Sequence, residues 1–226
     1  MDANDPCLCA RLGTFDKVLY GLFFLFALAF LAALPSIWPY PGSSVIKVIP
    51  ILALATLLWR HVPGLQGKLL FAGMLLSGVG DVILNVDRVG LFIPGLVAFL
   101  LAHLCYIAAF ATELRFTPKR AIPLAGLLVY ALVIGCFLKD IPSDKLPPVM
   151  AYLFIITLMA MGSFLLREPT LLICIGAIAF MISDTIIAVN KFLVPIPQST
   201  LINVSIYYAA QCMIVTGFIW RELRRR

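Results

Sequence analysis

Residues Leu69–Val86 read LLFAGMLLSGVGDVILNV, an apolar run whose only charged side chain is that of Asp81. A helix needs about 20 apolar residues to cross the hydrocarbon core of a bilayer, so the run predicts a membrane-spanning helix. An ionisable side chain at that depth is costly, and it is tolerated mainly where it faces a cavity or a partner. The same stretch therefore predicts both the kind of fold and the place of a functional site.

A second run, Leu171–Asn190, carries Asp184 within AFMISDTIIAVN, 103 positions after Asp81. In both runs an asparagine follows the aspartate, and the next apolar run contains tyrosine. A duplication of four spans restores the original orientation, so it gives parallel repeats and brings the two aspartates to similar depth. We therefore expect the two aspartates to face a shared cavity.

The whole chain has the composition of a membrane protein, since 62% of its 226 residues are hydrophobic, 12% are charged and its mean hydropathy is +1.05. We predict an all-α, polytopic integral membrane protein, a single transmembrane domain over residues 1–226 with eight spans. Its loops are too short to fold as domains, so any chemistry must use side chains from the helices. The first span is expected to be a helix and not a cleaved signal. The expected spans are Val18–Leu34, Val45–Trp59, Leu69–Val86, Leu91–Ala111, Ala121–Leu138, Val149–Leu166, Leu171–Asn190 and Thr200–Trp220.

Basic residues are distributed unevenly between the two sides of this bundle. An even number of spans puts both termini on one side, and twelve of the 17 basic residues fall there against four on the other side. This bias predicts cytoplasmic termini. The net charge of +6 requires no nucleic-acid partner, and the tail Arg221–Arg226 is expected to touch anionic lipid. The twelve are Arg11, Lys17, Arg60, Lys68, Arg115, Lys119, Arg120, Arg167, Arg221, Arg224, Arg225 and Arg226, and the four are Arg88, Lys139, Lys145 and Lys191.

Three charged residues share one layer of the predicted bundle. Asp81 and Asp184 lie about five and six residues from the outer ends of their spans, roughly 8–9 Å at 1.5 Å per residue. This is the depth at which the chain of a phospholipid joins its glycerol. Lys47, at the outer start of its span, either reaches this layer or snorkels to the interface. Tyr152 is equally ambiguous, because tyrosines commonly occupy membrane interfaces.

Further polar residues lie on the predicted helices after the two acidic spans. His103 and Tyr106 share one helix face, although a lone intramembrane histidine is more often a packing residue than a ligand. Tyr207, Tyr208 and Gln211 form a patch that we expect to face inward, because an aromatic belt alone would not require glutamine. With two histidines in the chain and an isolated Cys-x-Cys at residues 7–9, the sequence predicts no metal site.

Several strings together resemble the YhhN-like lysoplasmalogenase family of TMEM86-type membrane proteins. They are VIKVIP at Val45–Pro50, Gly80-Asp81, AHLCY at Ala102–Tyr106, ISDTIIAVNKF at Ile182–Phe192 and IYYAAQ at Ile206–Gln211. The strings run in matching order from the second span to the eighth, and they are specific in combination.

The resemblance implies hydrolysis of the vinyl ether bond of lysoplasmalogen, a lysophospholipid, to a fatty aldehyde and glycerophospho-ethanolamine or glycerophospho-choline. This reaction is acid catalysis through an oxocarbenium ion, for which two carboxyl groups of unequal pKa are suited, and it requires no cofactor. We assign Asp81 as the acid and Asp184 as the stabilising base, with the reverse assignment open. The functional positions implied are Lys47, Asp81, His103, Asp184, Tyr207, Tyr208 and Gln211, of which the two aspartates are the catalytic candidates and the others bind substrate.

Two other classes of function remain open. Intramembrane aspartates, a lysine and a possible repeat are also typical of a small proton-coupled transporter. A lipid-binding scaffold is a third interpretation. Serine and zinc hydrolases are disfavoured, since the chain has neither a G-x-S-x-G nor an H-E-x-x-H string. The short loops favour a bacterial inner membrane, with the endoplasmic reticulum as the alternative.

Cysteine labelling tests the predicted topology. In a chain whose native cysteines are replaced, an impermeant maleimide added to intact cells should label Lys145→Cys and leave Arg120→Cys unlabelled, because the two positions fall in loops on opposite sides. Lys139→Cys serves as a second outer position. Labelling of Arg120→Cys and Lys145→Cys from the same side would contradict the eight-span arrangement.

Overall fold

A computed structural model describes residues 12–37 and 42–225. The described chain forms eight long α-helices and one short 3-10 helix. They are α2 (Thr14–Ile37), α3 (Ser43–His61), α4 (Gly64–Val86), α5 (Phe92–Ala111), η1 (Pro118–Arg120), α6 (Ala121–Leu138), α7 (Leu146–Leu165), α8 (Leu171–Phe192) and α9 (Ser199–Arg225). Four residues discussed above, Cys7, Cys9, Arg11 and Arg226, lie outside the described residues.

Each helix coincides with one expected span, and all eight are long and apolar enough to cross a membrane. The prediction of a polytopic all-α membrane protein is therefore confirmed. The helix ends differ from the expected ones where polar residues extend an apolar run. Helix α4 begins at Gly64, directly after Pro63, and Gly64 has a φ of 70° that favours glycine. Helix α9 continues past Trp220 to Arg225, because its last turns lie in a polar network.

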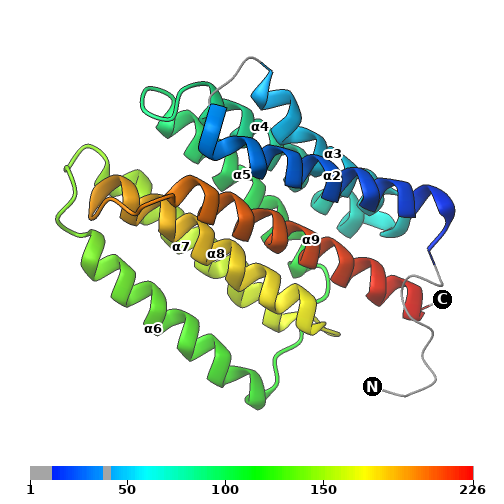
Figure 1. The fold of residues 1–226 in the computed structure, drawn as a ribbon. Coiled ribbons are helices and arrows are strands. Elements are labelled where there is room, and N and C mark those ends of the chain that lie inside the picture. The colour runs from blue at the N-terminus through cyan, green and yellow to red at the C-terminus, as the bar shows by residue number, and fades with distance from the viewer. Residues whose placement is uncertain (1–11, 38–41, 226) are drawn as a thin grey trace.

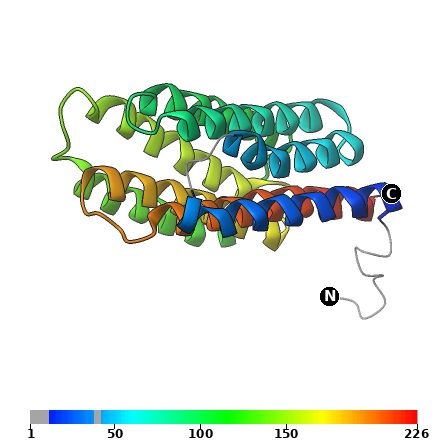
Figure 2. The same ribbon diagram turned by 45° about the horizontal axis from the view of Figure 1, so that its top comes forward.

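In chain order the eight long helices divide into two halves of four, α2–α5 and α6–α9, which can be followed by colour in Figures 1 and 2. Within each half, helices that follow one another in sequence pack as neighbours. Between the halves, α5 packs against α7 and α9 packs against α3. In both of these pairs the fourth helix of one half meets the second helix of the other. This is the contact pattern expected of parallel repeats related by a two-fold axis along the membrane normal.

Two glycines 103 positions apart allow equivalent close approaches in the two halves. A Cβ on Gly73 would lie 3.1 Å from the carbonyl oxygen of Ala102, where α4 meets α5. A Cβ on Gly176 would lie 2.9 Å from the carbonyl oxygen of Ala210, where α8 meets α9. Small residues let helix backbones approach in this way, so each acidic helix lies close against the fourth helix of its own half.

The halves differ in the position of their first helix. Helix α2 packs against both α3 and α9, and the hydroxyl groups of Tyr20 and Thr216 lie 3.0 Å apart. Helix α6 packs against α7 and only thinly against α8, and Figure 1 shows it standing at the edge of the bundle. Only 17% of its apolar segment is buried, against 61% for α9. The two-fold relation therefore breaks down at α6.

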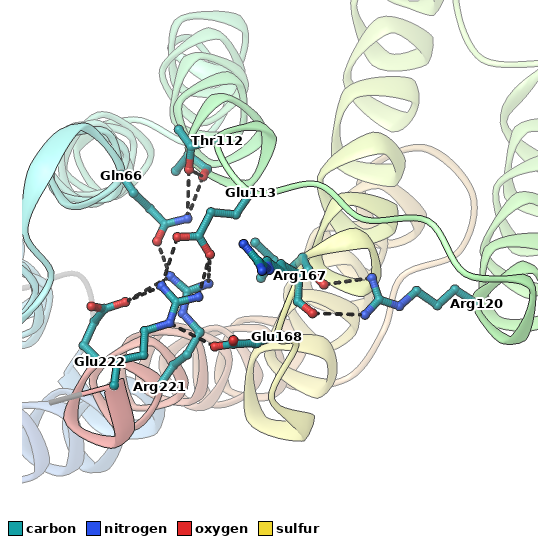
Figure 3. Close-up of polar contacts among 11 residues, drawn as sticks. Gln66, Thr112, Glu113, Arg120, Arg167, Glu168, Arg221 and Glu222 are labelled. Carbon is teal, nitrogen blue, oxygen red and sulfur yellow. Dashed lines mark hydrogen bonds and ion pairs between the residues drawn. The ribbon is translucent and has the colours of Figure 1, made fainter.

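A polar network ties together the end of the bundle where α2 begins and α9 ends (Figure 3). Arg221 is only 2% exposed, and its guanidinium group contacts Gln66, Glu222 and Glu113. Arg225 donates to both carboxylate oxygens of Glu113, at 2.9 and 2.8 Å. The expectation that this tail touches lipid is wrong for Arg221, because its charge is neutralised inside the protein.

The Glu113 contacts predict a pH-dependent stability. Hydrogen bonds from Arg225 hold the pKa of Glu113 below its usual value, although partial burial acts in the opposite sense. A carboxyl group with a lowered folded-state pKa contributes stability above its unfolded pKa, about 4.3, and this contribution is lost as the pH falls through the folded value. Glu113→Gln should therefore destabilise the detergent-solubilised protein at pH 7, by about 1 kcal/mol or less after solvent screening, and should have a smaller effect at pH 3.5.

The matched control is Glu168→Gln, because Glu168 is 56% exposed and meets the same Arg225 through one contact of 2.9 Å. We expect it to lower the melting temperature less than Glu113→Gln does. An equal loss of stability in Glu113→Gln at pH 7 and at pH 3.5 would contradict the role of the Arg225 hydrogen bonds.

Candidate active site

Asp81 lies in a buried ion pair built by three helices. The ammonium nitrogen of Lys47 on α3 is 2.8 Å from its Oδ1, and the hydroxyl of Tyr207 on α9 donates to its Oδ2 at 2.6 Å. The side chains of Lys47 and Asp81 are 5% and 4% exposed. The snorkelling interpretation of Lys47 is therefore wrong, since its charge stays inside the bundle beside Asp81.

Helix α9 also fixes the backbone that carries Lys47. The hydroxyl of Tyr208 donates to the carbonyl oxygen of Lys47 at 2.8 Å. Pro50 lies three residues further along α3 and lacks an amide hydrogen, so the helix loses one of its own hydrogen bonds in this turn. The bond from Tyr208 holds α3 against α9 at this weakened turn, and so holds Lys47 in place.

Asp184 on α8 is held by two side chains from two other helices. Its Oδ2 accepts a short hydrogen bond from the Tyr152 hydroxyl on α7 and lies 3.4 Å from Nε2 of His103 on α5. That same Nε2 lies 2.9 Å from the Tyr152 hydroxyl. Because Tyr152 donates its proton to Asp184, His103 contacts both oxygens as an Nε2–H donor. His103 is fully buried, whereas the Asp184 side chain is 9% exposed.

The two aspartates are held by equivalent helices in the two halves. Each contacts one side chain from the second helix of its own half and one from the fourth helix of the other half. Lys47 and Tyr207 occupy these places around Asp81, and Tyr152 and His103 occupy them around Asp184. The chemistry differs, because only the first set contains a lysine. Asp81 therefore has a cationic partner and Asp184 has a phenol and an imidazole.

Gln211 links the first set to a further tyrosine. Its amide oxygen accepts a hydrogen bond from the Tyr106 hydroxyl at 3.1 Å, and its amide nitrogen lies 3.5 Å from the Tyr207 hydroxyl. Both ends of the amide are thus used inside the protein. As expected, Tyr207, Tyr208 and Gln211 face inward, and all three are buried.

Both aspartates line one pocket of about 420 Å³. Its polar lining also includes Arg88, Asn203 and Tyr207. The other positions expected to bind substrate lie behind this wall and contact residues that form it, either directly or through Lys47. These positions are Lys47, His103, Tyr208 and Gln211.

A larger apolar pocket of about 580 Å³ adjoins the acidic one. The two share Asp184 and the apolar side chains of Leu84, Phe92, Phe99 and Ile187. Its remaining walls come from α5, α6, α7 and α8 and are almost entirely hydrocarbon, with Tyr152 and Thr185 as the polar exceptions. The site thus places an acidic centre beside a predominantly apolar pocket. Among the described residues, no group of three or more His, Cys, Asp or Glu side chains is placed to hold a metal ion.

Sequence reasoning did not select Tyr152, Arg88 or Asn203 as site residues. Tyr152 was indistinguishable from an interface tyrosine, although it lies 105 positions after Lys47 and the repeat spacing could have identified it. Arg88 resembled an ordinary loop charge. Asn203 resembled an ordinary polar residue, but its amide nitrogen donates to the carbonyl and hydroxyl oxygens of Ser183, at 2.8 and 2.7 Å.

The fold and the pockets define a class: a polytopic helical membrane protein in which one buried and one half-buried aspartate line a pocket beside an apolar one. The chain matches the YhhN family over residues 42–218 and belongs to that family.

Similar proteins include lysoplasmalogenase TMEM86B of Mus musculus, 34% identical over 84% of this chain and 80% of the relative. Lysoplasmalogenase TMEM86A of Homo sapiens is 32% identical over 84% of this chain and 83% of the relative. A lysoplasmalogenase of Mycobacterium bovis is 32% identical over 71% of this chain and 64% of the relative. No solved structure matches the chain.

The buried ion pair predicts a specific pattern of stability. Lys47→Met should destabilise the protein by about 3–5 kcal/mol, because it leaves the Asp81 carboxylate buried without a cation. The double variant Lys47→Met/Asp81→Asn should recover most of this loss, since it removes both charges. Melting temperatures of the purified proteins in detergent measure both effects. A Lys47→Met variant as stable as the unmodified protein, or a double variant less stable than either single, would contradict a compensating pair.

Proposed function

We propose that this protein is a lysoplasmalogenase that hydrolyses the vinyl ether bond of lysoplasmalogen by acid catalysis with Asp184 and Asp81. The products are a fatty aldehyde and glycerophospho-ethanolamine or glycerophospho-choline. The names of its relatives support the reaction. The observation that carries the mechanism is the unequal surroundings of two aspartates on one pocket, one ion-paired with lysine and one held by a phenol and an imidazole.

Asp184 acts as the general acid in this proposal, which reverses the assignment favoured by the sequence. Lys47 contacts Oδ1 of Asp81 at 2.8 Å and Tyr207 donates to its Oδ2 at 2.6 Å, so both oxygens of Asp81 are already engaged by the protein. Among the described residues, the side-chain contacts of Asp184 both end on Oδ2. A proton on Oδ1 would leave these contacts intact and would be available to the substrate.

The reaction proceeds in three steps. The proton of Asp184 is transferred to the vinyl carbon β to the ether oxygen, and the double-bond electrons form the new C–H bond. The resulting oxocarbenium ion is attacked by water, whose proton returns to the Asp184 carboxylate. The hemiacetal then collapses to the aldehyde and the free glycerol hydroxyl. The reaction needs neither a metal ion nor an organic cofactor.

Asp81 supplies the fixed negative charge beside the developing cation. Asp81 lines the pocket and Lys47 lies behind it, so the negative end of the ion pair faces the substrate. Tyr207 lines the same pocket and can orient the attacking water. Tyr208 and Gln211 act through their contacts with Lys47 and Tyr207. Glycosidases meet the same oxocarbenium problem with two carboxyl groups in unequal environments.

The adjoining apolar pocket accepts the alkenyl chain of the substrate. The excess of basic residues on one side sets the orientation of the protein in the bilayer. With both termini in the cytoplasm, the aspartates lie in the outer half of the bilayer. A bacterial inner membrane remains the favoured location and the endoplasmic reticulum the alternative.

Turnover by the purified protein tests the mechanism. In detergent with EDTA present, the protein should release aldehyde from lysoplasmalogen, whereas a transporter or a scaffold would release none. Asp184→Asn should lower kcat by at least about 10²-fold, as is typical for a lost general acid. Asp81→Asn leaves the buried Lys47 without its carboxylate partner, so it should be compared with the double variant Lys47→Met/Asp81→Asn, which removes both charges. Both variants should lose activity. Asp144→Asn, a control at an exposed carboxylate between α6 and α7 that lines neither pocket, should retain it. Near-normal turnover by Asp184→Asn at matched stability would remove Asp184 from the mechanism.

A further inference from the structure

Beyond the two aspartates, a third pocket of about 610 Å³ adjoins the site and carries positive charge. Its lining includes Arg88 and Lys191 and, among the described residues, no carboxylate. It shares Arg88, Phe92, Ile187 and Asn203 with the acidic pocket, so the two pockets lie side by side. Asn190 and Ser199 add neutral polar groups to the same wall.

The structure holds both cations at this junction. An Arg88 guanidinium nitrogen donates to the Thr200 hydroxyl at 2.6 Å. The Lys191 ammonium nitrogen lies 4.4 Å from the centroid of the Phe92 ring, and Phe92 lines all three pockets. Lys191 is also within electrostatic range of Arg88 and Lys145, with Asp87 as the opposing charge. Two cations kept close together in this way create a site for an anion.

The spacing relates these cations to the catalytic centre. Arg88 and Lys191 are themselves 103 positions apart, and each lies seven residues beyond the aspartate of its half. On α8, seven residues are two helical turns, about 10 Å along the axis, which returns Lys191 to the face of Asp184. Helix α4 ends at Val86, so Arg88 lies in the turn just beyond the helix that carries Asp81. The long side chains of Arg88 and Lys191 can reach back toward the aspartates over part of the distance between them. The separation that remains between the cations and the aspartates is roughly the length of a glycerol backbone.

We propose that Arg88 and Lys191 form a subsite for the phosphodiester group of the lysophospholipid, which rests on the proposed function. The alkenyl chain then occupies the apolar pocket, the vinyl ether lies between the aspartates, and the phosphate meets the two cations. Arginine and lysine are the side chains suited to phosphate oxygens.

The surroundings of Arg88 support this placement. Burial lowers the pKa of Arg88, with Asp81 acting in the opposite sense. A bound anion therefore compensates a charge that the surroundings disfavour.

A comparison of two substrates tests the subsite. The first is an alkenyl-glycerophospho-ethanolamine, and the second is the matching alkenylglycerol, which lacks the phosphate. The specificity constant kcat/KM is measured for each, and the ratio of the two values reports the contribution of the phosphate. Arg88→Gln and Lys191→Gln should each lower this ratio by about tenfold or more, because each removes a charge-assisted contact made by the phosphorylated substrate only.

The control variant is Lys139→Gln, which removes a cation at the outer end of α6 outside the three pockets and should leave the ratio unchanged. An unchanged ratio in Arg88→Gln and Lys191→Gln would overturn the proposal, as would an equal loss for both substrates.

Binding of unreactive ligands separates this inference from the proposed function. Saturated alkyl-glycerophospho-ethanolamine and alkylglycerol have no vinyl ether, so their affinities test the subsite even if no turnover is found. The phospholipid should bind at least about tenfold more tightly, and the double variant Arg88→Gln/Lys191→Gln should abolish this preference. Equal affinities in the unmodified protein would overturn the subsite whatever the enzyme activity.

Competition with inorganic phosphate distinguishes a lipid headgroup from free phosphate as the anion that this subsite binds. At the concentration at which glycerophospho-ethanolamine displaces half of the bound alkyl lysolipid, inorganic phosphate should displace little, because it lacks the glycerol that spans the two pockets. Displacement by inorganic phosphate with equal potency would show a free-phosphate site and overturn the assignment to the lipid headgroup.

Discussion

A charge inside a membrane protein must be compensated, and the Lys47–Asp81 pair shows how much structure this requirement organises. The pair joins α3 to α4, and the hydroxyl groups of Tyr207 and Tyr208 bring α9 to the same point. Moving any of these helices away would leave a buried charge or polar group unsatisfied. The three helices are thus fixed by electrostatics at a level of the bilayer where hydrophobic packing alone discriminates weakly between neighbours.

The same requirement is relaxed around Asp184. With a phenol and an imidazole as partners, this carboxyl group has hydrogen-bond donors but no permanent cation. Among the described residues both of these side-chain contacts end on Oδ2, and the proposed proton transfer uses the other oxygen, Oδ1. The difference between the surroundings of Asp81 and those of Asp184 therefore lies in a few side chains on equivalent helices.

Hydropathy and charge were sufficient to predict the eight spans and to single out Asp81 and Asp184, because charged residues within apolar runs are rare enough to be informative. The patch of Tyr207, Tyr208 and Gln211 was also predicted to face inward, because glutamine has no use in lipid. Tyr152 and Arg88 were missed for the opposite reason, since interface tyrosines and loop arginines are common in membrane proteins. Arg221 was assigned to lipid because its partners Gln66 and Glu113 come from distant segments, and sequence alone does not bring such segments together.

The approximate two-fold relation of the halves affects the orientation in which a ligand can bind. A perfectly symmetric pair of aspartates would accept an asymmetric molecule in two orientations of equal energy, one of which presents the wrong end to the proton donor. Unlike partners on the two carboxyl groups, and a chamber beside Asp184 that the outlying α6 helps to wall, remove this degeneracy. The irregularities that obscure the repeat thus give the site a direction.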